Sequence, residues 1–221
     1  MGPGADDACA ETFELVTSWW AARGLERGAD LDRRHPLAAA GLLVQDDLCV
    51  MVHRDGRWHL DAAMLCFPSA WVLGEKMGHT VAAIHAPVDH YDSELEARVD
   101  VFFDRLRVER PVWRRNVSLK TTHALHLPYS KLDPVTRPDE IGADGAPYWI
   151  RSERQTLRKL PRTGAILFGI RVQLAPASVL LARPDIAAAL VTVIGSWDAP
   201  MRDFKAAASM DAFARWLASI G

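Results

Sequence analysis

The sequence predicts an α+β fold in which a five-stranded antiparallel sheet carries helices on one face. Two observations lead to this class. First, Asp55-Gly56 lies between two apolar runs, and this pair is typical of a two-residue β-hairpin, because that turn needs positive φ at both central residues. Second, three further strand-like segments follow one another in the second half of the chain. A hairpin and a three-strand meander separated by helices form one sheet.

The first half of the chain is predicted to hold a helix, the hairpin and a broken helical stretch. Phe13, Val16 and Trp19 recur at helical spacing behind an acidic start, which favours an amphipathic helix. After the hairpin, two glycines and Pro87 interrupt a helical pattern whose last part, from Asp92, has a capping-type start and an apolar stripe. The predicted elements are a helix over 10–23, strand, turn and strand over 42–66, and helical segments over 68–106.

Alternation of side-chain types predicts the strands of the second half. A segment rich in Pro, Asp and Gly reads as a long surface loop, and an apolar stripe near the end reads as a helix. The predicted elements are strands over 112–119, 148–160 and 165–174, a loop over 128–147 and a helix over 203–219. This layout is that of a PAS-type domain over residues 39–178, between helical segments at 1–38 and 179–221.

Composition excludes several classes of partner. The chain has 221 residues, 49% of them hydrophobic and 24% charged, with a formal net charge of −2. This balance gives no basis for nucleic-acid or membrane-surface binding, and no apolar run is long enough to span a bilayer. Three widely spaced cysteines form neither a disulfide framework nor an iron–sulfur motif. Because the acidic N-terminus lacks the features of a signal peptide, we expect a cytoplasmic protein.

One histidine stands inside an otherwise apolar segment. His85 is flanked by Ile84 and by Ala86-Pro87-Val88, and an imidazole there costs free energy to bury unless its ring nitrogens are used. A hydrogen-bonded core histidine would satisfy this requirement, and so would a ligand to haem iron. The sequence segment by itself leaves both interpretations open.

Five phrases in order resemble the α-subunit of haem-dependent oxidative N-demethylase, over roughly residues 40–175. The phrases are Leu43-Val44-Gln45-Asp46-Asp47-Leu48-Cys49, Leu65-Cys66-Phe67-Pro68-Ser69, Glu75-Lys76-Met77-Gly78, Ile84-His85-Ala86-Pro87-Val88 and Glu153-Arg154-Gln155-Thr156-Leu157-Arg158-Lys159-Leu160-Pro161-Arg162-Thr163-Gly164. The resemblance implies a haem-binding PAS fold that oxidises a small secondary amine with O2. It also implies electrons from a separate reductase component that carries flavin and iron–sulfur groups.

With this resemblance, His85 becomes the first candidate for the haem b ligand, because neutral imidazole binds both ferrous and ferric iron. Ile84 and Pro87 would cover one face of the porphyrin with apolar side chains. Lys76 and Arg158 are candidates for the haem propionates, since cationic side chains suit carboxylates. Lys76 reads equally well as a solvated surface residue. Cys49 is the competing iron ligand, although a cysteine in an apolar strand is more often a small core residue.

Arg154 and Gln155 are the candidate catalytic residues, because a cationic or amide donor near the haem would polarise O2. Successive strand residues face opposite ways, so only one of the two can point into a given pocket. The alternative is that Arg154 and Arg158 belong to an exposed face. The sequence does not decide between them.

The sequence thus favours a haem-dependent oxygenase that acts on a small amine by N-dealkylation or N-oxygenation. The alternative is a haem-based gas or redox sensor, because one fold serves many functions. Dinucleotide, P-loop, hydrolase and zincin motifs are absent from the sequence. Electrons would therefore come from another polypeptide, and a homo-oligomer remains open.

Overall fold

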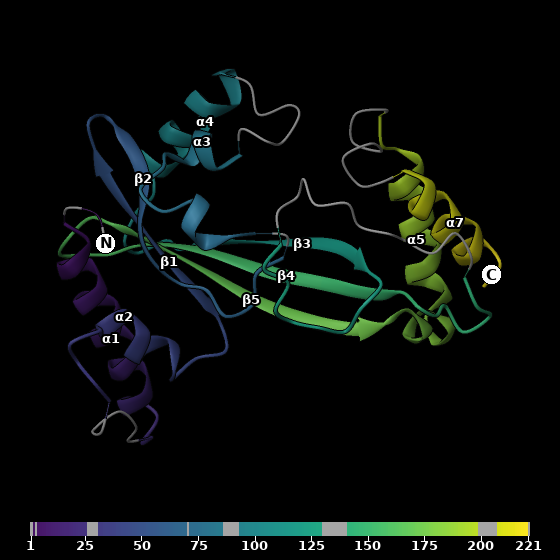
Figure 1. Cartoon of the computed structure of the whole chain (residues 1–221), viewed down its shortest axis with the longest axis horizontal. Helices are drawn as coiled ribbons and strands as arrows, with labels where there is room; N and C mark the ends of the chain where they lie inside the picture. The colour runs from purple at the N-terminus through teal and green to yellow at the C-terminus, as the bar shows by residue number, and fades with distance from the viewer. Residues whose placement is uncertain are drawn as a thin grey trace. The chain divides into compact units, whose positions relative to one another are not determined.

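The computed structural model describes residues 2, 4–25, 31–69, 71–85, 93–129, 141–198 and 207–220; at 85, 93–97 and 207–210 it describes the backbone alone. The chain is an α+β protein with one five-stranded antiparallel sheet in the order β2-β1-β5-β4-β3 (Figure 1). The strands are β1 Asp47–Arg54, β2 Arg57–Met64, β3 Val112–Lys120, β4 Trp149–Lys159 and β5 Ile166–Pro176. The predicted hairpin and three later strands are confirmed.

The hairpin turn has the predicted conformation. Asp55 has a φ of 52° and Gly56 a φ of 74°, so both central residues lie in the left-handed region that a two-residue turn requires. A bulge follows further along the hairpin, where Val50 pairs with Ala62 but Met51 pairs with Leu60. The skipped residue, Asp61, is fully buried, and Arg54 donates to its carboxylate through Nε at 3.0 Å and Nη2 at 3.2 Å.

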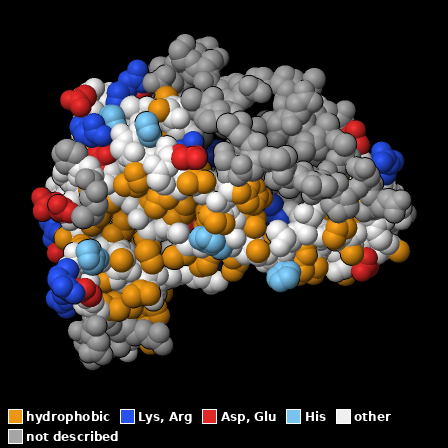
Figure 2. Space-filling model, in the orientation of Figure 1, with side chains coloured by type: hydrophobic (Ala, Val, Ile, Leu, Met, Phe, Trp, Pro, Cys, Tyr) orange, Lys and Arg blue, Asp and Glu red, His pale blue; other side chains and the backbone are white. Residues whose placement is uncertain are grey.

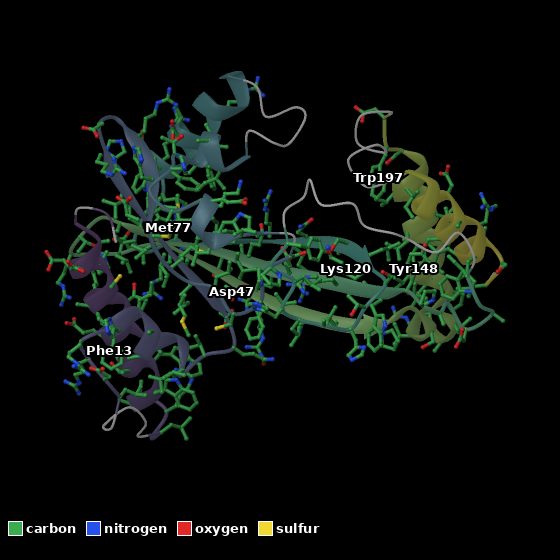
Figure 3. The ribbon with its side chains drawn as sticks, viewed as in Figure 1. Phe13, Asp47, Met77, Lys120, Tyr148 and Trp197 are labelled. Carbon is green, nitrogen blue, oxygen red and sulfur yellow. The ribbon has the colours of Figure 1, made fainter. Side chains whose placement is uncertain are left out.

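Helices cover both faces of the sheet: the helices after the hairpin lie on one face, and the N-terminal helices, which the sequence assigned to neither face, lie on the other. Leu48 and Val50 of β1 pack in one core cluster with α1 and α2, whereas Cys49 and Met51 pack in another with α3 and α4. Phe13 and Met77, which Figure 3 labels, belong to the first and the second cluster. The helices concerned are α1 Ala5–Ala21, α2 Pro36–Gly41, η1 Leu73–Glu75, α3 Val81–His85 and α4 Ser93–Asp104.

The chain divides into two compact units. The first comprises residues 1–115, 126–131 and 153–172, and the second 116–125, 132–152 and 173–221. The second unit has its own core, in which Tyr148 packs with Phe213 and Trp216 of helix α7 Ala207–Ala218 and with helix α5 Pro184–Gly195. The sequence predicts α7 but does not locate α5 within its C-terminal helical segment.

Gly145 shows how tightly this second core is built. An added Cβ at Gly145 would lie 2.6 Å from the Trp216 ring, and its φ of 83° also requires glycine. Most of the predicted loop over 128–147 lies outside the described residues. None of the described helices combines the length and apolar character needed to cross a membrane.

Candidate functional site

Strand β4 divides the two candidate catalytic residues between opposite faces of the sheet. Leu157 packs in the cluster of α3 and α4, and Gln155 lies two residues before it on the same face. Thr156 lies on the other face. Its hydroxyl lies 2.8 Å from where a Cβ on Gly169 would be, and Gly169 pairs with Leu48. Leu48 packs in the core cluster of α1 and α2. Alternation therefore places Arg154 and Arg158 on this second face, where both side chains are exposed.

Gln155 is the centre of a polar group on the face of α3 and α4. Arg114 of β3 donates from Nε to the Gln155 Oε1 atom at 2.8 Å. The Gln155 amide nitrogen in turn donates to Glu153 Oε2 at 3.2 Å. These two hydrogen bonds fix which end of the amide points toward each neighbour. The second N–H of this amide has no partner among the described residues, so it can donate to a ligand.

Arg154 belongs to a different set of contacts. Its guanidinium lies 5.8 Å from the centre of the Trp113 ring. It also attracts the carboxylate of Asp46, which pairs with Arg171 at 3.7 Å between Oδ2 and Nη1. Burial raises the pKa of Asp46, while the charges of Arg171 and Arg154 act in the opposite direction. Arg154 is thus held in an arginine-rich surface rather than beside Gln155.

Helix α3 brings the candidate haem ligand to the same side as Gln155. The helix begins after Thr80, whose hydroxyl accepts a hydrogen bond from the Ala83 N–H at 3.2 Å, and it ends at His85. Ile84 packs against the core cluster of Cys49, Met51 and Trp58. The His85 side chain and Pro87 lie outside the described residues. Lys76 ends the short helix η1 and is half-buried.

The competing ligand, Cys49, has the properties of a core residue. It is 1% exposed, and burial raises the pKa of its thiol to about 12, with the charge of Asp47 adding to the effect. A thiol is the protonated form and does not bind iron as a thiolate does. At neutral pH this side chain therefore behaves as a small apolar group.

Four other histidines take part in local contacts. His59 Nδ1 lies 3.1 Å from the Gly78 carbonyl, and His126 Nδ1 lies 3.0 Å from the Cys66 carbonyl. The ring centres of His53 and Trp58 are 5.1 Å apart, and those of His123 and Trp149 are 5.5 Å apart. Each of these four rings thus lies against a backbone carbonyl or a tryptophan ring.

The sequence reasoning missed two buried carboxylates, each of which contacts at least one of the matched phrases. Asp47 Oδ1 accepts hydrogen bonds from the backbone N–H groups of Cys66 at 2.6 Å and Phe67 at 2.9 Å. It thereby ties the first phrase to the second. The only sequence signal for this role is an acidic residue directly before the apolar run of β1.

Glu11 of α1 is the second of these carboxylates. It accepts from the N–H of Arg162 at 2.8 Å and from the N–H and hydroxyl of Thr163 at 3.0 and 2.7 Å. Burial raises the pKa of Glu11, but these hydrogen bonds outweigh it and hold the pKa below its ordinary value. Glu11 therefore ties helix α1 to the turn at Arg162 and Thr163, which lies at the end of the longest matched phrase.

The residues on this face fit a haem better than a metal ion held by protein alone. Among the described residues, no group of three or more His, Cys, Asp or Glu side chains could hold a metal. Haem iron needs only one or two protein ligands, because the porphyrin supplies the others. One histidine at the end of α3, apolar neighbours such as Ile84, and the cationic Arg114 supply the required kinds of side chain.

The fold and this face together define an α+β protein with a hydrogen-bonded amide group on the sheet face that α3 covers. Residues 10–213 match the family described as haem-dependent oxidative N-demethylase, alpha subunit-like. The match covers most of the chain, so the chain belongs to this family, whose description is that of a haem-dependent oxidative enzyme. This confirms the family resemblance drawn from the five phrases.

Proposed function

We propose that this chain binds haem b through His85 and uses it to oxidise a small secondary amine with O2. The observation that carries the proposal is that α3, which ends at His85, and the oriented amide of Gln155 belong to one face of the sheet. Family membership over residues 10–213 supports the haem and the amine chemistry. The layout of hairpin, helices and three-strand meander supports a PAS-like fold for the haem-binding part.

Haem, when bound, supplies an iron at which O2 is reduced. In N-demethylation, an N-methylamine, O2, two electrons and two protons give the demethylated amine, formaldehyde and water. The two electrons must come from outside this chain, whose sequence has no flavin or iron–sulfur motif. We therefore include a separate flavin and iron–sulfur reductase in the proposal.

The chain's own side chains have distinct roles on this face. With haem bound, Gln155 would offer its second amide N–H to the reacting oxygen, and the hydrogen bond from Arg114 holds the amide in that orientation. Glu153 offers a negative charge to the protonated form of the amine. With haem bound, Ile84 would help to exclude water from the site, and Lys76 would be placed to pair with a propionate.

A haem titration followed by turnover tests this function. Purified protein is reconstituted with hemin, and its Soret band is recorded; we expect saturation at one haem per chain. The holoprotein is then supplied with O2, a chemical reductant and a panel of N-methylated secondary amines, and formaldehyde is measured. Failure to bind haem would refute the proposal outright. Haem binding with a stable oxygenated spectrum and no product from any amine would favour the sensor.

A further inference from the structure

The sheet face opposite Gln155 carries a concentrated positive charge. The Leu160 N–H bonds to the Ala165 carbonyl at 2.8 Å, and continuing this antiparallel register along β4 and β5 places Arg154 opposite Arg171. Arg158 lies four residues after Arg154 on the same face. Two cations placed directly opposite each other repel, so this arrangement favours a neighbouring anion.

Asp46 offsets only part of this charge. It pairs with Arg171 and attracts Arg154. Arg158 has no ion-pair partner among the described residues, and its side chain is exposed. The chain as a whole has a formal charge of −2, so the positive charge here is a local feature and does not reflect the composition. A surface of this kind attracts a negatively charged partner.

Trp113 gives the same surface an apolar centre. Large hydrophobic side chains reach the surface in several places (Figure 2), and Trp113, 63% exposed, lies near the guanidinium of Arg154. Tryptophan and arginine are among the residue types most enriched at the energetic centres of protein interfaces. The strand that carries Trp113, β3, is also one of the two edge strands of the sheet. We call Trp113, Arg154, Arg158 and Arg171 the arginine face.

We propose that the arginine face is the docking surface for an acidic electron-transfer protein. This rests on the proposed function, which requires electrons from outside the chain. Arg154 and Gln155 are adjacent on β4 and point to opposite faces, so a carrier on the arginine face would be separated from the proposed haem site by the thickness of one sheet. Electron carriers commonly dock through small, charge-complementary contacts, and this surface matches that type.

Equilibrium binding of an acidic plant-type [2Fe–2S] ferredoxin to the full chain tests the proposal without using haem. The variant reverses two charges, Arg154→Glu with Arg158→Glu, and its circular dichroism is compared with that of the parent. The control reverses the exposed Arg105 and Arg110, so both variants change the net charge by the same amount. We expect the Kd to rise at least tenfold in the first variant and less than twofold in the control, with a shallower salt dependence in the first variant only.

Equal weakening in both variants would overturn the proposal, because it would reflect net charge alone. Absence of saturable binding at low salt would also overturn it. So would a DNA duplex that binds more tightly than the ferredoxin and loses affinity in the same variant. Should the double reversal perturb the fold, Arg158→Gln alone must still weaken ferredoxin binding. If reconstitution gives no Soret band, the haem function is refuted, but the measured binding of ferredoxin still holds. If the haem-loaded protein fails to bind ferredoxin, only the docking proposal is refuted.

Discussion

The two faces of strand β4 differ in how their charged groups are compensated. On the face of α3 and α4, the Gln155 amide joins one cation, Arg114, to one anion, Glu153, in a chain of hydrogen bonds. On the other face, Arg154 and Arg158 are exposed, and Asp46 is shared between two arginines. A compensated group can be held in one orientation, which suits chemistry, whereas an uncompensated cationic surface suits recognition of an anionic partner.

This comparison shows that neighbours in one motif can serve different purposes. Arg154 and Gln155 are adjacent in the longest matched phrase, yet the pleat of the strand directs them to opposite faces. Assigning one role to every residue of this phrase would therefore merge the two separate faces of the sheet. The predictions below test whether the two faces act independently.

The largest expected effect is the loss of haem in His85→Ala. Removing the imidazole removes a direct bond to iron, so we expect the haem content after reconstitution to fall more than tenfold. The matched control is His123→Ala, whose ring lies against Trp149 and whose replacement should leave the Soret band unchanged. Absorption spectra of the ferric and ferrous–CO forms provide the measurement. An unaltered spectrum in His85→Ala would move the ligand to another residue.

The next largest effect distinguishes the two faces directly. Gln155→Ala removes the oriented amide, and we expect the rate of amine oxidation to fall roughly 10- to 100-fold while haem content stays near that of the parent. Arg154→Ala, on the opposite face, should leave turnover with a chemical reductant within about threefold. Formaldehyde production by haem-loaded protein measures both rates. Equal losses in the two variants would show that the faces are coupled.

The main features of the fold could be predicted because their signals are local. Asp55-Gly56 specifies its turn through backbone conformation, and alternation identifies the later strands. The coverage of both faces was missed, although β1 carries a visible signal for it. Leu48, Cys49 and Val50 form a continuous apolar run, which is typical of a strand buried on both sides.

The buried carboxylates could not be predicted for a different reason. Glu11 lies in a helix whose pattern marks it as an ordinary polar position, and its partners are about 150 residues away in sequence. Such pairs become visible only when the chain is folded. The bulge at Asp61 is similar, because it depends on the pairing of two strands and not on either strand alone. The five phrases that carry the family resemblance contain neither Glu11 nor Asp61.

Glu11 should have a moderate effect on stability and none on the chemistry. Glu11→Ala leaves the N–H groups of Arg162 and Thr163 without their acceptor, and we expect the free energy of unfolding to fall by about 1–3 kcal/mol. Because the pKa of Glu11 is lower in the folded protein, its stabilisation is present above its ordinary pKa and is lost as the pH falls through the lowered one. Urea unfolding between about pH 3 and pH 7 measures this effect.

The isosteric variant Glu11→Gln isolates the charge in that experiment. It cannot ionise, so its stability should change less than that of the parent over the acidic range. Glu14→Gln on the same helix is the control, since the Glu14 carboxylate is exposed and pairs with the side chain of Arg162. A parent and a Glu11→Gln variant with the same acid dependence would show that another carboxylate is responsible.

The smallest effect is expected at Cys49, which lies on the same side of the sheet as Gln155 but within the core. Its thiol has a pKa of about 12, so ionising it at neutral pH to bind iron would require a large free energy. Cys49→Ala should therefore leave the Soret band and the ferrous–CO spectrum unchanged and lower the free energy of unfolding by about 1 kcal/mol through lost packing. If instead Cys49→Ala abolishes the haem spectrum while His85→Ala retains it, the ligand is the thiolate. The proposed haem site on the face of α3 and α4 would then have to be rebuilt around β1.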